Sequence, residues 1–125
     1  MIRTIVSILV SFAIIFGLSF YELHYVQTTF KQLHEALVAL YEKSETATAS
    51  YEDGVAVQAL WEDKREHLHI WMPHTVLQEI DYQLNETMGY LYLQDYANTL
   101  PKISLLIGIT ESVPVSYTFR LGNVF

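Results

Sequence analysis

The stretch from Thr4 to Tyr21 constrains this chain more than any other, because it carries no charged residue and is mostly apolar. An α-helix rises about 1.5 Å per residue, so a stretch of this length approaches the ~20 residues that cross a ~30 Å hydrocarbon layer. Its apolar residues fall on every face of a helix, which is typical of a span rather than of a core helix with one buried side. The sequence therefore predicts a single-pass transmembrane anchor over residues 1–21.

The charges that flank this stretch predict its orientation. Arg3 and the terminal amine lie before it, and Glu22 is the first charged residue after it. Basic residues stay on the cytoplasmic side, so we expect a cytoplasmic N-terminus and the bulk of the chain outside the cell membrane. A cleaved signal peptide is the alternative, with Gly17-Leu18-Ser19 as its cleavage site. We favour the uncleaved anchor, because the apolar run exceeds the ~7–15 residues of a signal-peptide core.

Composition limits what the rest of the chain can do. Arg3 is one of 7 basic residues, so the part after the anchor carries 6 of them against 14 acidic ones, a net charge of −8. This charge disfavours binding to nucleic acid and to anionic lipid headgroups, since both need Lys and Arg. The absence of cysteine excludes disulfides and thiolate chemistry. We therefore expect one modest domain over residues 22–113 that is stabilised by helix packing.

Apolar residues with helical spacing continue past the anchor. They form a heptad seam on a first soluble helix that reaches about Lys43, and its members are Leu23, Val26, Phe30, Leu33, Leu37 and Leu40. The seam needs a partner surface. We expect that surface within the same chain, and the alternative is a second copy, which would make the protein a homo-oligomer.

Three further helices follow from the same periodicity. Asp53 is a candidate N-cap for the second, and Pro73 ends it. The third starts at Pro73 or Thr75, and Asp95 is a candidate cap for the fourth. The predicted fold is all-α, with the N-terminal transmembrane helix continuing into an antiparallel bundle of about four helices. Two residues disfavour an unbroken fourth helix, namely Pro101 and Gly108.

Residues 114–125 show a different pattern. Val115, Tyr117, Phe119 and Leu121 alternate with polar residues after Pro114. A period of two predicts an extended C-terminal tail. One interpretation places this tail along a groove of the bundle, and the other adds it as a strand to the sheet edge of a partner.

Several short segments resemble a bacterial family, the domain-of-unknown-function family 4363 (DUF4363). Besides the anchor and the first long helix, they are Trp61 with His67-Leu68, Trp71-Met72-Pro73-His74, Leu77-Gln78-Glu79-Ile80, Glu111-Ser112-Val113-Pro114 and Leu121-Gly122-Asn123-Val124-Phe125. The chain departs from the family's pattern at Gln78, where an acid is expected, and at Pro101 with Gly108. The resemblance implies a small, membrane-anchored helical protein without an established activity, with a neighbouring integral membrane protein as its expected partner.

Few residues suggest chemistry. His67, His69 and His74 are the local cluster of potential metal ligands, but a helix turns ~100° per residue and points the first two nearly opposite ways. HEXXH spacing is absent, so we expect no metal, no cofactor and no enzymatic activity. The acidic pairs Glu62 with Glu66 and Glu79 with Asp81 are predicted to be solvated helix faces.

Aromatic residues are the remaining candidates for a functional surface. Tyr and Trp are favoured at protein interfaces, and the candidates are Tyr82, Tyr90, Tyr92 and Tyr96, together with Tyr117 and Phe119 of the tail. The sequence therefore predicts a non-enzymatic interaction module for another membrane or envelope protein. The alternatives are a helical bundle that senses a small molecule and a metal-binding protein based on the three histidines.

Overall fold

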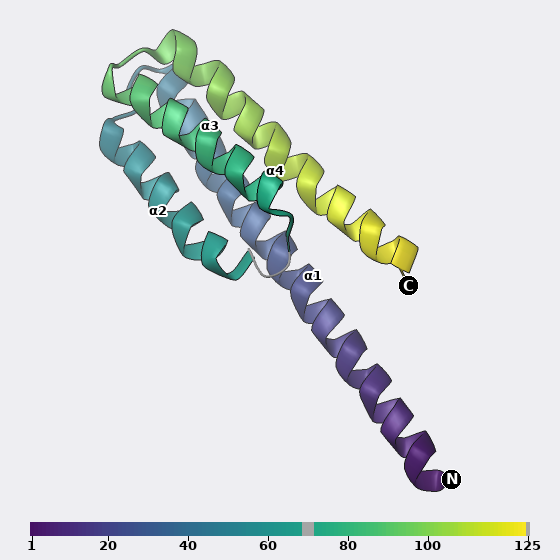
Figure 1. The fold of residues 1–125 in the computed structure, drawn as a ribbon. Helices are drawn as coiled ribbons and strands as arrows, with labels where there is room; N and C mark the ends of the chain where they lie inside the picture. The colour runs from purple at the N-terminus through teal and green to yellow at the C-terminus, as the bar shows by residue number, and fades with distance from the viewer. Residues whose placement is uncertain (69–71, 125) are drawn as a thin grey trace.

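The structure, a computed structural model, describes residues 1–68 and 72–124, with the backbone alone for residues 116–124. Four helices make up the fold: α1 (Ile2–Glu45), α2 (Tyr51–Leu68), α3 (His74–Tyr92) and α4 (Tyr96–Val124). The described ranges contain no strand. The predicted all-α bundle is therefore confirmed. The C-terminal half of α1 packs in the bundle with α2, α3 and α4, and its N-terminal half projects alone as a stalk (Figure 1).

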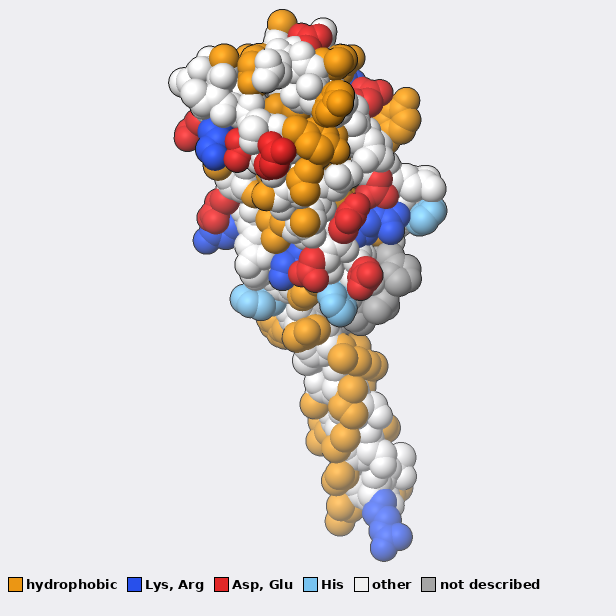
Figure 2. Space-filling view, turned by 90° about the vertical axis from the view of Figure 1, so that its left-hand side faces the viewer, with side chains coloured by type: hydrophobic (Ala, Val, Ile, Leu, Met, Phe, Trp, Pro, Cys, Tyr) orange, Lys and Arg blue, Asp and Glu red, His pale blue; other side chains and the backbone are white. Residues whose placement is uncertain are grey.

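The stalk consists of the apolar stretch predicted from the sequence. Residues 1–18 are all exposed, and the exposed fractions of Leu9 and Phe20 reach 62% and 72%. In Figure 2 apolar side chains wrap the stalk, and a basic side chain marks its tip. Among the described residues, α1 is the helix long and apolar enough to cross a membrane. These properties fit a membrane span, and a signal sequence would share them.

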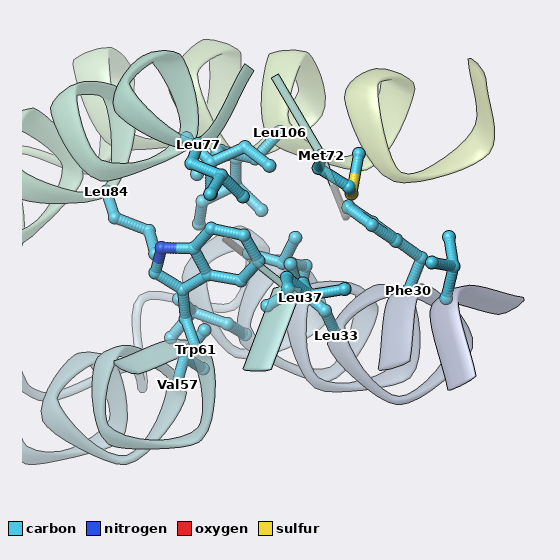
Figure 3. Packing of buried hydrophobic residues seen from close by; sticks show 14 of the residues in the cluster. Phe30, Leu33, Leu37, Val57, Trp61, Met72, Leu77, Leu84 and Leu106 are labelled. Atoms are coloured by element: carbon cyan, nitrogen blue, oxygen red, sulfur yellow. The ribbon is translucent and has the colours of Figure 1, made fainter. Parts of the chain in front are cut away.

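The predicted seam of α1 is buried inside the bundle. Val26, Phe30 and Leu37 are each 0% exposed, and Leu33 and Leu40 are nearly so, while Leu23 is half-buried. The other three helices of the same chain supply the rest of this core. Its centre is the Trp61 ring, whose centroid lies 6.2 Å from that of Phe30 (Figure 3). The seam's partner is therefore the same chain, as predicted, rather than a second copy.

The two tight connections lie together at the end of the bundle far from the stalk (Figure 1). Ala47 and Gln94 each adopt a left-handed conformation with φ of 56°. A residue of this kind lets the chain turn back and close the end of the preceding helix. Thr48 N–H accordingly donates to Lys43 O at 2.8 Å, and Asp95 N–H to Tyr90 O at 2.9 Å. We call this end of the bundle the distal end.

The start of α2 differs from the prediction. Ser50, and not Asp53, caps this helix: Asp53 N–H donates to Ser50 Oγ at 3.2 Å, while Ser50 N–H donates to Asp53 Oδ2 at 2.9 Å. This reciprocal pair is a capping box in which an acid three residues after the cap also accepts a bond. An acid in the first turn therefore resembles a cap in sequence. For α4 the predicted cap is confirmed, since Asp95 Oδ1 accepts from Asn98 N–H at 3.3 Å.

The predicted extended tail is wrong for residues 114–124, because α4 continues as a helix through Pro101 and Pro114 to Val124. Phe125 lies outside the described residues. An isolated extended segment leaves its backbone N–H and C=O groups without partners, whereas a helix pairs most of them internally. Two prolines remove two of these bonds, and the helix retains the others. The predicted boundary at residue 114 between a helical bundle and an extended tail is therefore absent from the described part of the chain.

Candidate functional site: the distal patch and the polar grooves of the bundle

The close approach of α2 and α3 at Gly54 shapes the distal end. A Cβ atom on Gly54 would lie 2.6 Å from Met88 Sδ and 2.7 Å from Leu91 Cδ1, closer than side-chain carbons come in proteins. A Cβ at this position would therefore require the side chains of Met88 and Leu91 on α3 to shift. This contact brings Tyr51 beside Tyr92, and their ring centroids lie 5.6 Å apart in an edge-to-face arrangement. Aromatic pairs favour that geometry.

These two tyrosines belong to an exposed apolar cluster, which we call the distal patch and define as Tyr51, Val55, Tyr92 and Leu93. Tyr92 and Leu93 are 72% and 71% exposed, and the other two members are each more than 40% exposed. Tyr51 and Val55 are four residues apart and share one face of α2. Contiguous apolar surface with exposed aromatic rings is typical of a contact site for another protein.

The predicted tyrosines divide between structural and exposed positions. Tyr92 joins the distal patch, and Tyr82 is 62% exposed on α3. Tyr96 is half-buried, and its hydroxyl donates to Ala49 O at 2.6 Å. This residue therefore links the start of α4 to the connection between α1 and α2. Tyr90 is also half-buried. The backbone of Tyr117 and Phe119 lies in α4, but their side chains are outside the described part of the structure.

Tyr51 was not among the candidates predicted from the sequence. It lies far from Tyr92 along the chain, and its neighbours suggest only a linker. The signal in the sequence was Gly54. Glycine lowers the stability of a helix, so it is often retained only where another backbone or side chain comes close. That signal indicates a close approach but not its partner.

Of the acidic residues predicted to lie on solvated helix faces, Glu62, Glu66 and Glu79 are exposed. Asp81 differs, because it is half-buried and joins α3 to α2. Trp61 Nε1–H donates to Asp81 Oδ1 at 2.7 Å. Arg65 Nε lies 2.8 Å from Asp81 Oδ2 as an ion pair, although Nε makes no hydrogen bond. A buried indole needs an acceptor, so the burial of Trp61 explains the half-buried carboxylate.

The same contact lines an open groove of about 360 Å³, which also includes Gln58, Glu62, Leu84 and Asn85. Gln58 Nε2 donates to Asn85 Oδ1 at 2.9 Å across it. Arg65 therefore pairs with Asp81, and Gln58 with Asn85, across this groove. A small-molecule sensor remains a prediction, and this groove is where its ligand would bind.

The histidine cluster does not assemble among the described residues. The His67 ring packs edge-to-face on Tyr25 with centroids 5.9 Å apart, and His74 Nε2 lies 3.0 Å from Gln78 Nε2. His69 falls outside the described residues. Within ranges 1–68 and 72–124, no group of three His, Cys, Asp or Glu side chains is placed to hold a metal ion.

Two ion pairs each perturb the pKa of a bundle residue. Hydrogen bonding to Glu86 raises the pKa of Lys102 above its usual value, and the same ammonium donates to Gln83 Oε1 at 3.3 Å. The backbone N–H of Ser50, followed by Lys43 at 3.0 Å, lowers the pKa of the Asp53 carboxyl. Lys102 joins α4 to α3, and Asp53 joins α2 to the end of α1.

Comparisons with known proteins add no identification: no family model matches the chain, and neither a curated protein nor a solved structure matches it. The resemblance to the domain-of-unknown-function family 4363 therefore remains a prediction.

Proposed function

We propose that the protein is a membrane-tethered, non-enzymatic interaction module whose distal patch binds another membrane or envelope protein outside the cytoplasm. In this proposal the segment from Ile2 to Tyr21 crosses the membrane with Arg3 on the cytoplasmic side. The bundle then positions the distal patch at a fixed height above the bilayer. The resemblance to a family of small membrane-anchored helical proteins supports the same assignment.

The observation that carries this proposal is that the two ends of the molecule differ. An exposed apolar helix lies at one end (Figure 2), and the exposed rings of Tyr51 and Tyr92 lie together at the other. From Tyr21 to Glu45, α1 rises by about 36 Å at ~1.5 Å per residue. A partner must therefore present its contact surface roughly 36 Å above the bilayer. This height favours a protein with a domain outside the membrane over one that consists of transmembrane helices alone.

A photo-reactive amino acid placed at Tyr92 of the full-length protein tests this proposal in intact cells. We expect one discrete adduct with a membrane or envelope protein, which disappears when Leu93→Ser and Val55→Ser remove apolar area from the patch. The matched control is the same photo-reactive residue at Tyr82, also exposed on α3 but outside the patch. It should give no such adduct.

Adducts of equal yield from both positions, or an adduct that survives the double substitution, would refute the distal patch as the binding surface. A unique adduct between two copies of the chain would replace the proposed partner with self-association.

A further inference from the structure

The C-terminal half of α4 runs back toward the stalk, and two contacts fix its register. Tyr96 Oη donates to Ala49 O near one end, and His34 Nδ1 lies 3.1 Å from Thr110 Oγ1 nearer the other. Between these contacts α4 advances from position 96 to 110, while the facing chain goes back from position 49 to 34. The two segments are thus antiparallel, and the facing segment is helical from Glu45 to His34.

This register sets the height at which α4 ends. From Thr110, α4 continues to Val124, the last residue of the helix. This segment is as long as the one from Tyr96 to Thr110. The facing level on α1 is then close to Phe20, where the uncharged stretch ends. In Figure 1, α4 likewise ends at about the level along the bundle where the bare stalk begins.

The composition of this part of α4 differs from that of the rest of the domain. None of the 14 acidic residues lies after Glu111, and the single charged residue in 112–125 is Arg120. The same segment is rich in apolar and aromatic residues, namely Val113, Val115, Tyr117, Phe119, Leu121, Val124 and Phe125. Val115, the last residue whose side chain is described, is 69% exposed. The apolar segment that ends α4 thus begins at an exposed position, Val115.

We propose that the C-terminal turns of α4, residues 115–124, contact the headgroup region of the bilayer that holds the stalk. This inference depends on the proposed membrane span of α1. Tyrosine and other aromatic residues are favoured at the boundary between headgroups and hydrocarbon. A basic residue such as Arg120 is attracted to lipid phosphates.

The height and the charge favour lipid over a protein partner at this site. The last turn of α4 lies at the level where the apolar stalk gives way to Glu22, so the bilayer surface is already present there. The acidic domain as a whole is repelled by anionic lipid, and this acid-free helix end is the exception. Two points of membrane contact, the stalk and α4, would hold the bundle upright and keep the distal patch directed away from the membrane.

The cysteine-free chain allows a direct test by site-specific fluorescence in the full-length protein. Single variants Asn123→Cys, Phe12→Cys and Gln94→Cys carry an environment-sensitive dye in phosphatidylcholine vesicles. The lipids carry a quencher either near the headgroup or in the middle of the acyl chain. We expect the dye at position 123 to be quenched several-fold more by the shallow quencher than the dye at position 94. The dye at position 12 should respond to the deep quencher.

Quenching at position 12 without quenching at position 123 would overturn the α4 contact and leave the membrane span intact. An unquenched dye at position 12 would overturn the span and, with it, the α4 contact. A blue-shifted but unquenched dye at position 123 would overturn the lipid contact and show that protein covers this helix end. Tyr117→Ser with Phe119→Ser should reduce quenching at position 123, whereas Tyr82→Ser with Tyr92→Ser should not.

Discussion

Gly54 and Gly89 lie on facing helices at the distal end, but the space around them differs. A Cβ on Gly54 would collide with Met88 and Leu91, whereas nothing lies within 4 Å of one on Gly89. Alanine gains up to about 1 kcal/mol over glycine in a helix, and overpacking costs about 1–3 kcal/mol. We expect Gly89→Ala to raise the free energy of unfolding by about 0.5–1 kcal/mol. Gly54→Ala should stabilise the protein less than Gly89→Ala does, because the side chains of Met88 and Leu91 must shift to admit the new Cβ.

Thermal or urea unfolding of the full-length protein, followed by circular dichroism, measures both changes. If Gly54→Ala stabilised the protein as much as Gly89→Ala, the close contact of α2 with α3 would be incorrect, and the placement of Tyr51 beside Tyr92 would be incorrect with it.

Asp53 predicts a dependence of stability on pH. Its pKa is lowered in the folded state by Ser50 and Lys43, so folding favours the carboxylate. This contribution is fully present above the ordinary aspartate pKa of about 3.9 and is lost as the pH falls through the lower folded pKa. Wild type should exceed Asp53→Asn in stability by about 0.5 kcal/mol at pH 7, and the two should converge once the pH falls below the lowered folded pKa of Asp53.

The same unfolding measurement across pH, repeated with Lys43→Met, separates the partners. Lys43→Met should destabilise the wild type but have almost no effect in the Asp53→Asn background, because the pair is already broken. A constant difference between wild type and Asp53→Asn from about pH 2 to 7 would contradict the assignment.

Helices α3 and α4 are joined by a polar contact as well as by their apolar faces. Lys102 forms an ion pair with Glu86 and donates to the buried Gln83. Lys102→Met keeps the length of the side chain but leaves both acceptors without this donor, so we expect it to lower the thermal midpoint by a few degrees. Lys31→Met, at an exposed position of α1, is the control and should leave the midpoint almost unchanged. Equal effects in the same unfolding assay would exclude a stabilising role for the Lys102 contact.

At the scale of elements, the spacing of apolar residues predicted which residues of a helix are buried. The seam from Val26 to Leu40 repeats every three or four residues, and each seam residue in that range is buried. The tail prediction failed because Val115 to Leu121 alternate in sequence, and alternation does not show whether an extended backbone has partners. The distal patch was predicted only in part, since it depends on a contact between Tyr51 and Tyr92 that no local pattern records. Asp81 was missed for the same reason, because its partner Trp61 lies on another helix.

At the scale of the whole molecule, one helix supplies both the apolar stalk and the centre of the bundle. α1 has 44 residues and spans about 66 Å, so it connects the proposed membrane span to the distal end without a hinge. The negative charge of the domain keeps it away from anionic surfaces, while the end of α4 returns to the level of the stalk. In the proposed orientation the distal patch would face away from the bilayer, where a partner outside the membrane could reach it.

The most direct test of this account is labelling of single cysteines in intact cells with a membrane-impermeant maleimide, which the cysteine-free chain permits. We predict that Gln94→Cys, at the distal end, is labelled in intact cells and that the protein stays in the membrane fraction. Ile2→Cys should be labelled only after the cells are permeabilised. The reverse pattern, or a labelled Gln94→Cys chain that has lost its first residues and appears in the medium, would contradict a tethered bundle outside the cytoplasm.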